Sequence, residues 1–232
     1  MAMIDKKLPE RVAKMKQVGV KNVNIASNAS LLTEKMGRRL IEAGLDEIYI
    51  TLDSMKKDVY EAIRIRLNFD TVFENILRFI ELRNELNPKL RIRMQMVLQE
   101  LNHTEGVAFE SFWRGKLGPN DQVVLQKAHN WANAVDVMSF GDEQDANAIP
   151  CIALWGTFVV HVNGDAALCC MDTETKHLLG NIWEQSIEEI WNGPKMAEIR
   201  EQHLTNRRHE IKICDGCTLW REEKHQSKQA AE

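Results

Sequence analysis

The five cysteines are the residues of this sequence whose type and spacing could do chemistry. Cys151, Cys169 and Cys170 lie within one stretch, PCIALWGTFVVHVNGDAALCC, and Cys214 and Cys217 follow later as the pair Cys-Asp-Gly-Cys. Thiolates from a widely spaced pair and from a C-x2-C pair can bind one metal centre when the chain folds back between them. The sequence therefore predicts a metal centre in the last third of the chain.

The neighbouring cysteines at positions 169 and 170 cannot both reach that centre. Adjacent side chains on a strand point to opposite faces, so one of the two is spare and four thiolate ligands remain. Four soft ligands suit either an iron–sulfur cluster or a zinc ion that staples a small domain, and the spacing alone favours neither. Cysteines that merely fill a core are a third interpretation, which the tight C-x2-C pair makes less attractive.

Composition disfavours several other functions. The 232 residues are 44% apolar and carry a net charge of -4, so no basic field is present to hold nucleic acid. No stretch approaches the ~18 consecutive apolar residues of a membrane span, and the first residues lack the apolar run of a signal peptide. An odd number of cysteines, clustered late in the chain, argues for metal or redox chemistry over a disulfide framework. We therefore expect a cytoplasmic protein that binds neither nucleic acid nor membranes.

The elements upstream of the cysteines must position whatever ligand the chain binds. Helical and strand-like patterns alternate four times with short connections, which predicts an α/β fold with about four parallel strands. The predicted helices cover residues 9–18, 33–43, 70–86 and 106–114, the third of them capped by Asp70, and the predicted strands cover residues 20–26, 47–52, 90–98 and 122–126.

Polar side chains on or beyond the ends of these strands are candidate binding residues. Ligands of parallel α/β sheets sit beyond the carboxyl ends of the strands. Asn28 follows the first predicted strand, Thr51 lies at the end of the second, Asp53 follows the second, and Gln95 lies on the third. Each of them can equally be a turn former or a helix cap.

A second, smaller unit is expected after the polar stretch GDEQDANA at residues 141–148. Strands at 157–162 and 165–170 flank Asn163-Gly164, a pair that favours a type I′ hairpin turn. A helix then begins at about Ser186, because Ser186 and Glu189 form a capping box.

The cysteine spacing C-x12-G-x4-C (Cys151, Gly164, Cys169), followed by C-x2-C, resembles the SPASM or twitch domain of radical S-adenosylmethionine enzymes. Upstream, SNASLLTEKMGRRLIEAGLDEIYITLDS is similar to the later part of the same enzymes' partial (β/α) barrel. The resemblance implies an auxiliary [4Fe–4S] cluster on Cys151, Cys169, Cys214 and Cys217. It also implies a partial barrel over residues 1–140, a linker over 141–149, a SPASM domain with a β-hairpin over 150–221 and a disordered tail over 222–232.

The sequence departs from this family at one decisive motif. The catalytic cluster of the family is held by C-x3-C-x2-C, which is found nowhere in the 232 residues. We therefore expect the chain to start after the first two barrel strands and to be catalytically incomplete alone. S-adenosylmethionine would bind only where the missing part is supplied, with Thr51 and Asp53, and more weakly Asn28 and Gln95, lining its pocket.

The expected partners follow from this interpretation. One is a polypeptide that supplies the missing strands, and another is a peptide or small-molecule substrate. The strand at 20–26 would be left as an unpaired edge, through which the chain could dimerise. The alternative function is a zinc-stapled binding module without redox chemistry.

Overall fold

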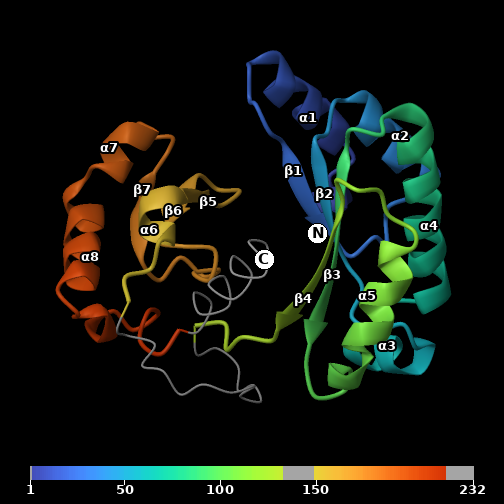
Figure 1. Cartoon of the computed structure of the whole chain (residues 1–232). Coiled ribbons are helices and arrows are strands. Elements are labelled where there is room, and N and C mark those ends of the chain that lie inside the picture. The colour runs from blue at the N-terminus through green and yellow to red at the C-terminus, as the bar shows by residue number, and fades with distance from the viewer. Residues whose placement is uncertain (1, 133–148, 218–232) are drawn as a thin grey trace. The chain divides into compact units, whose positions relative to one another are not determined.

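The computed structural model describes residues 2–132 and 149–217. The chain divides into two compact units, Met1–Ala128 and His129–Glu232, which are taken separately here (Figure 1). Residues 141–148 of the predicted linker and the whole predicted tail, 222–232, lie outside the described residues. Within the described ranges, no helix is both long and apolar enough to cross a membrane.

Unit 1 contains a parallel four-stranded sheet in the order β1-β2-β3-β4, which confirms the predicted α/β class. The strands are β1 (Asn24–Ser27), β2 (Glu47–Thr51), β3 (Arg91–Leu98) and β4 (Gln122–Lys127). Its helices are α1 (Leu8–Gln17), α2 (Glu34–Glu42), α3 (Lys57–Ile63), α4 (Phe69–Leu86) and α5 (Gly106–Arg114), with short 3-10 turns η1 (Ala2–Ile4) and η2 (His103–Glu105).

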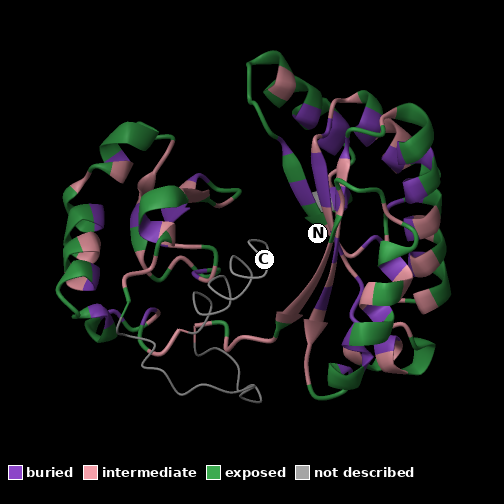
Figure 2. Cartoon of the chain, viewed as in Figure 1, coloured by how far each residue is buried: buried purple, intermediate pink, exposed green. Residues whose placement is uncertain are grey.

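The sheet of unit 1 has one apolar and one polar face. Alternate side chains of the central strands β2 and β3 are fully buried, among them Ile48, Ile92 and Met94. The helices α2, α4 and α5 lie along one side of the sheet (Figure 1), and their apolar side chains share one core with these strand residues. On the other face, Tyr49 and Arg93 are only partly buried. Figure 2 shows both buried and intermediate residues along the strands of this sheet. The period-two alternation of β3 therefore separates a packed core from a polar surface.

Helix caps fix where the helices of unit 1 begin. The Thr33 hydroxyl accepts a hydrogen bond from the backbone N–H of Met36, so α2 begins where the sequence predicts. The predicted cap of α4, Asp70, is wrong, because the side chain of Asn68 accepts the bond from Thr71 N–H and α4 starts at Phe69. Asp70 lies within the first turn of α4 and pairs with Lys57 instead.

Unit 2 holds a three-stranded antiparallel sheet in the order β5-β6-β7. Its elements are α6 (Ala153–Gly156), β5 (Val159–Val160), β6 (Asp165–Ala167), β7 (Leu178–Asn181), α7 (Ile187–Trp191), α8 (Pro194–Leu204) and the 3-10 turn η4 (Arg208–Glu210). The hairpin of β5 and β6 confirms the prediction, but its strands are shorter than predicted. The helix predicted from Ser186 is two helices, because Pro194 begins α8 directly after Gly193.

The hairpin turn differs from the predicted type I′. Gly164 has a φ of +89°, but Asn163 is not among the described residues with positive φ, and a type I′ turn needs both. The N–H of Gly164 donates to the carbonyl of His161 at 2.9 Å, and the N–H of His161 donates to the carbonyl of Asp165 at 2.9 Å. The connection is therefore a three-residue loop with glycine in the left-handed position.

Candidate metal centre

The four predicted ligands come from three segments of unit 2. Cys151 lies just before α6, and Cys169 lies two residues beyond the end of β6. Cys214 and Cys217 stand at the two ends of a turn that follows η4. In that turn the N–H of Cys217 donates to the carbonyl of Cys214 at 3.3 Å, and Gly216 has a φ of +64°. Glycine adopts this left-handed conformation at little cost, so the CDGC sequence favours a tight turn between its two cysteines.

The five cysteines differ in burial. Cys214 is buried and packs in the core of unit 2, beside residues such as Leu154 and Ile211. Cys151, Cys169 and Cys217 are half-buried, whereas Cys170 is exposed. Of the two neighbouring cysteines, Cys169 is therefore the less exposed.

The thiols are close enough for their charges to interact. Burial raises the pKa of Cys214 to about 12, and Cys169, Cys151 and Cys217 each raise it further as neighbours. Burial likewise raises the pKa of Cys169 to about 11, with contributions from Cys170 and Cys217. Three segments that are distant in sequence thus bring four thiols into one electrostatic neighbourhood.

This donor set fits a metal centre chemically. Four thiolates together would repel one another in a buried place, and a cationic centre bound to them removes that repulsion. Sulfur-only ligands favour iron–sulfur clusters or zinc over magnesium or calcium. Among the described residues, however, no three His, Cys, Asp or Glu side chains are already arranged to hold a metal ion. The thiols thus lie near one another, but they are not arranged to coordinate a single metal ion.

A buried histidine lies against the first of these cysteines. The backbone N–H of Cys151 donates to Nδ1 of His203 at 3.1 Å, so Nε2 carries the proton when the ring is neutral. Burial and the charge of Arg208 lower the pKa of His203 to about 4, which keeps the ring neutral at pH 7. Its Nε2 is buried and has no hydrogen-bond partner within the described part of the chain.

The histidine at the β5–β6 hairpin, His161, already has a hydrogen-bond partner. Nε2 of His161 contacts the backbone carbonyl of Asp172 at 3.1 Å, so this nitrogen carries a proton that it donates to the carbonyl. A ring nitrogen used in this way is not available as a ligand to a metal.

Of the residues predicted at the strand ends, Asp53 is buried within unit 1, with an exposed fraction of 1%. One carboxylate oxygen accepts hydrogen bonds from Nε of Arg64, and the other accepts from the N–H of Val97 at 3.0 Å. Asn102 donates to the carbonyls of Asp53 and Val97. Asp53 thus ties the ends of β2 and β3 together, and its role toward a bound cofactor stays a prediction.

The other three predicted residues, Asn28, Thr51 and Gln95, are half-buried. Asn28 accepts hydrogen bonds from the N–H and hydroxyl of Ser30, as a turn former does. Thr51 and Gln95 are partners in the register of β2 and β3, and Gln95 donates to the side chain of Gln126 at 2.6 Å. Thr51, Gln95 and Gln126 therefore lie close together on neighbouring strands.

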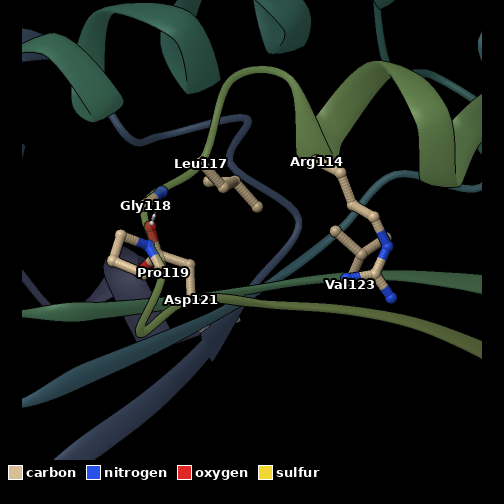
Figure 3. Close-up of a pocket in the computed structure, with 6 residues that line it drawn as sticks. All are labelled: Arg114, Leu117, Gly118, Pro119, Asp121 and Val123. Carbon is tan, nitrogen blue, oxygen red and sulfur yellow. Dashed lines mark hydrogen bonds between the residues drawn. The ribbon is translucent and has the colours of Figure 1, made fainter.

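A cavity of about 220 Å³ lies at the beginning of β4 in unit 1, away from the carboxyl ends of the strands (Figure 3). Its one acidic side chain, Asp121, accepts hydrogen bonds from Arg83, Ile92 and Gly118. This carboxylate holds the fold together at that edge, so we assign the cavity no binding role.

Sequence reasoning missed two residues of the cysteine neighbourhood, His203 and Arg208. Arg208 is buried, with an exposed fraction of 2%, although it lies in the charged stretch NRRHE. The only sequence signal for it is its place six residues before Cys214.

Comparison with known proteins finds similarity over most of the chain. Residues 151–218 match the SPASM family, described as an iron–sulfur cluster-binding domain. A probable GTP 3′,8-cyclase of Methanococcus maripaludis is 32% identical over 74 residues, which are 32% of this chain and 24% of that protein. Molybdenum cofactor biosynthesis protein 1 of Dictyostelium discoideum is 32% identical over 110 residues, which are 47% of this chain and 16% of that protein. The matched spans are thus a quarter or less of these relatives.

Two solved structures share the fold over 94% of this chain. BtrN in complex with AdoMet and 2-DOIA superposes with a TM-score of 0.55 at 19% identity, covering 68% of that chain. The anSMEcpe protein with bound AdoMet superposes with a TM-score of 0.59 at 14% identity, also covering 68% of that chain. Residues 151–218 thus match the SPASM family of iron–sulfur cluster-binding domains, and the chain shares its fold with these two AdoMet-bound structures.

Proposed function

We propose that unit 2 holds an auxiliary [4Fe–4S] cluster on Cys151, Cys169, Cys214 and Cys217. The observation that carries this proposal is that Cys214 lies within electrostatic range of Cys151 and Cys169, which come from distant segments, and of Cys217 in its own turn. Four cysteine thiolates are the usual ligands of such a cluster. The match of residues 151–218 to an iron–sulfur cluster-binding domain supports the same assignment.

Each ligand has a distinct role in this proposal. Cys214 anchors the centre to the core of unit 2, and the turn at Gly216 returns the chain so that Cys217 follows it. Cys151 is oriented by its backbone bond to His203, and the carbonyl of Cys169 accepts a hydrogen bond from the N–H of Asp172 at 3.1 Å. The bound cluster would supply one-electron redox chemistry or a direct contact to substrate.

Unit 1 is proposed as the wall of a site for S-adenosylmethionine and for a peptide or small-molecule substrate. The similar structures of BtrN and anSMEcpe were solved with AdoMet bound, which supports this role. Asn28, Thr51, Asp53 and Gln95 are its candidate residues. The 232 residues contain no C-x3-C-x2-C motif, so we propose the radical reaction only for an assembly in which another polypeptide supplies that motif.

Anaerobic reconstitution with iron and sulfide tests the proposed cluster against the zinc staple. We expect a brown protein with a broad absorption band near ~400 nm and about four irons and four sulfides per chain. A colourless protein that retains about one zinc per chain would support the zinc-stapled module and contradict the cluster.

A further inference from the structure

Arg208 is a buried cation inside the four-cysteine neighbourhood. It lies in η4, and its exposed fraction is 2%. Arginine is almost never buried to this degree unless its guanidinium is satisfied by specific partners. The guanidinium of Arg208 must therefore have partners among the groups around the candidate ligands.

The guanidinium of Arg208 binds the backbone of two candidate ligands. Nε donates to the carbonyl of Cys214 at 3.0 Å, and Nη2 donates to the carbonyl of Cys217 at 2.9 Å. Nη1 donates to the carbonyl of Ile149 at 3.3 Å, two residues before Cys151. The planar fork of one side chain thus joins the CDGC turn to the segment that leads into Cys151.

The contacts of Arg208 fix the position of its positive charge. All three nitrogens of the guanidinium donate to backbone carbonyls of the segments that carry Cys151, Cys214 and Cys217. The buried guanidinium therefore places a positive charge beside the candidate ligands.

We propose that Arg208 is a positioning residue that holds the CDGC turn against the Cys151 segment and raises the reduction potential of the cluster bound there. This inference rests on the proposed cluster. Reduction by one electron adds a negative charge to a centre that already carries four thiolates. A fixed cation in a region of low dielectric stabilises that added charge, so the reduced state forms at a higher potential.

The test compares three variants of the reconstituted full chain. Arg208→Gln removes the charge, and Arg208→Lys keeps the charge but loses the fork. Arg207→Gln is the matched control, because Arg207 is the adjacent residue, its side chain is 45% exposed and it pairs with Glu210 at 3.2 Å. Iron per chain is counted first, and the midpoint potential is then measured by dithionite titration followed by electron paramagnetic resonance.

The expected result is a more negative midpoint potential in Arg208→Gln, a potential close to that of the parent protein in Arg208→Lys, and no shift in Arg207→Gln. Loss of iron from Arg208→Gln but not from Arg208→Lys, with the unfolding transition of the metal-free protein retained, would also support the proposal. Equal potentials in the parent and Arg208→Gln would overturn it, as would an equal negative shift in both Arg208 variants. Loss of the unfolding transition in both variants would contradict it too, because Arg208 would then be needed for folding itself. If the parent protein binds no iron at all, the proposed cluster fails, which is a different outcome.

Discussion

Single residues differ in how far the sequence reveals them. Cysteines are rare and reactive, so five of them with a C-x2-C pair indicate a metal centre before any fold is known. Arg208 gives no such signal, because its partners are backbone carbonyls whose positions depend on the folded chain. Asp53 shows the opposite difficulty. Its place after a strand suggests that it binds a ligand, but its carboxylate accepts hydrogen bonds from Arg64 and Val97 within the protein.

Asp46 gives a pH-dependent prediction at this scale. Partial burial opposes its ionisation, but hydrogen bonds from Lys16 and from the N–H of Val23 outweigh that effect and lower its pKa. Because the folded pKa is below the unfolded pKa, the stabilisation is present above the unfolded value and is lost as the pH falls through the folded one. We expect Asp46→Asn to destabilise unit 1 by about 1–2 kcal/mol at pH 7 and to have much less effect at acidic pH. Urea unfolding at several pH values measures this, and an effect independent of pH would contradict it.

Individual helices and strands were predicted well where patterns are long, and less well where they are short. The β3 alternation and the α4 periodicity predicted those elements closely. Strand β7 was not predicted, because its four residues include Gly180, which weakens a strand pattern. The division of α7 from α8 could have been read from Gly193-Pro194, a pair that ends one helix and starts another.

The hairpin turn of unit 2 depends on Gly164. An added Cβ would lie 2.2 Å from Nε1 of Trp183, and the φ of +89° disfavours any other residue. Trp183 is largely exposed and can move, so the backbone strain is the main cost. We expect Gly164→Ala to destabilise unit 2 by about 2 kcal/mol. In the control Gly156→Ala, no atom lies within 4 Å of the new Cβ, so thermal unfolding should change little. Equal losses in both variants would argue against this account of the turn.

A buried ion pair joins α4 to the start of β4. Arg83 and Asp121 have side-chain exposures of 3% and 0%, and Nη1 of Arg83 lies 2.9 Å from Oδ1 of Asp121. Arg83→Met would leave the Asp121 charge buried without this partner, which costs about 3–5 kcal/mol. The control Arg78→Met removes exposed pairs of the same helix and should cost at most about 1 kcal/mol. Chemical denaturation compares them, and similar losses would contradict the assignment.

For the whole molecule, the alternation of helices and strands was enough to predict the fold class. The sequence could not indicate whether another segment covers the edge strand β1 of unit 1. In the structure β1 is shorter than predicted, Asn24–Ser27, and the 3-10 turn η1 packs beside it, with Met3 buried and Sδ of Met3 3.6 Å from Oγ of Ser27. This contact depends on residues distant from β1 in sequence, which local patterns do not reveal.

The partly covered edge predicts weak self-association. Unpaired edge strands invite pairing with a second chain, but a four-residue strand offers few hydrogen bonds. We expect a concentration-dependent dimer in sedimentation velocity that Ala26→Glu abolishes, because charge on an edge blocks pairing. Val107→Glu, at a position that is 82% exposed on α5, is the control and should leave the dimer intact. A strictly monomeric protein at high concentration would contradict this prediction.

The central claim is that four thiols from three distant segments bind one cluster. Its most direct test is the iron and sulfide content of two reconstituted variants, Cys214→Ser and Cys170→Ser. Cys214 is the buried candidate ligand, and Cys170 is the exposed neighbour of Cys169. We predict that Cys170→Ser keeps about four irons and four sulfides per chain, as the parent protein does, while Cys214→Ser loses most of both. Equal iron and sulfide in the two variants would contradict the assignment.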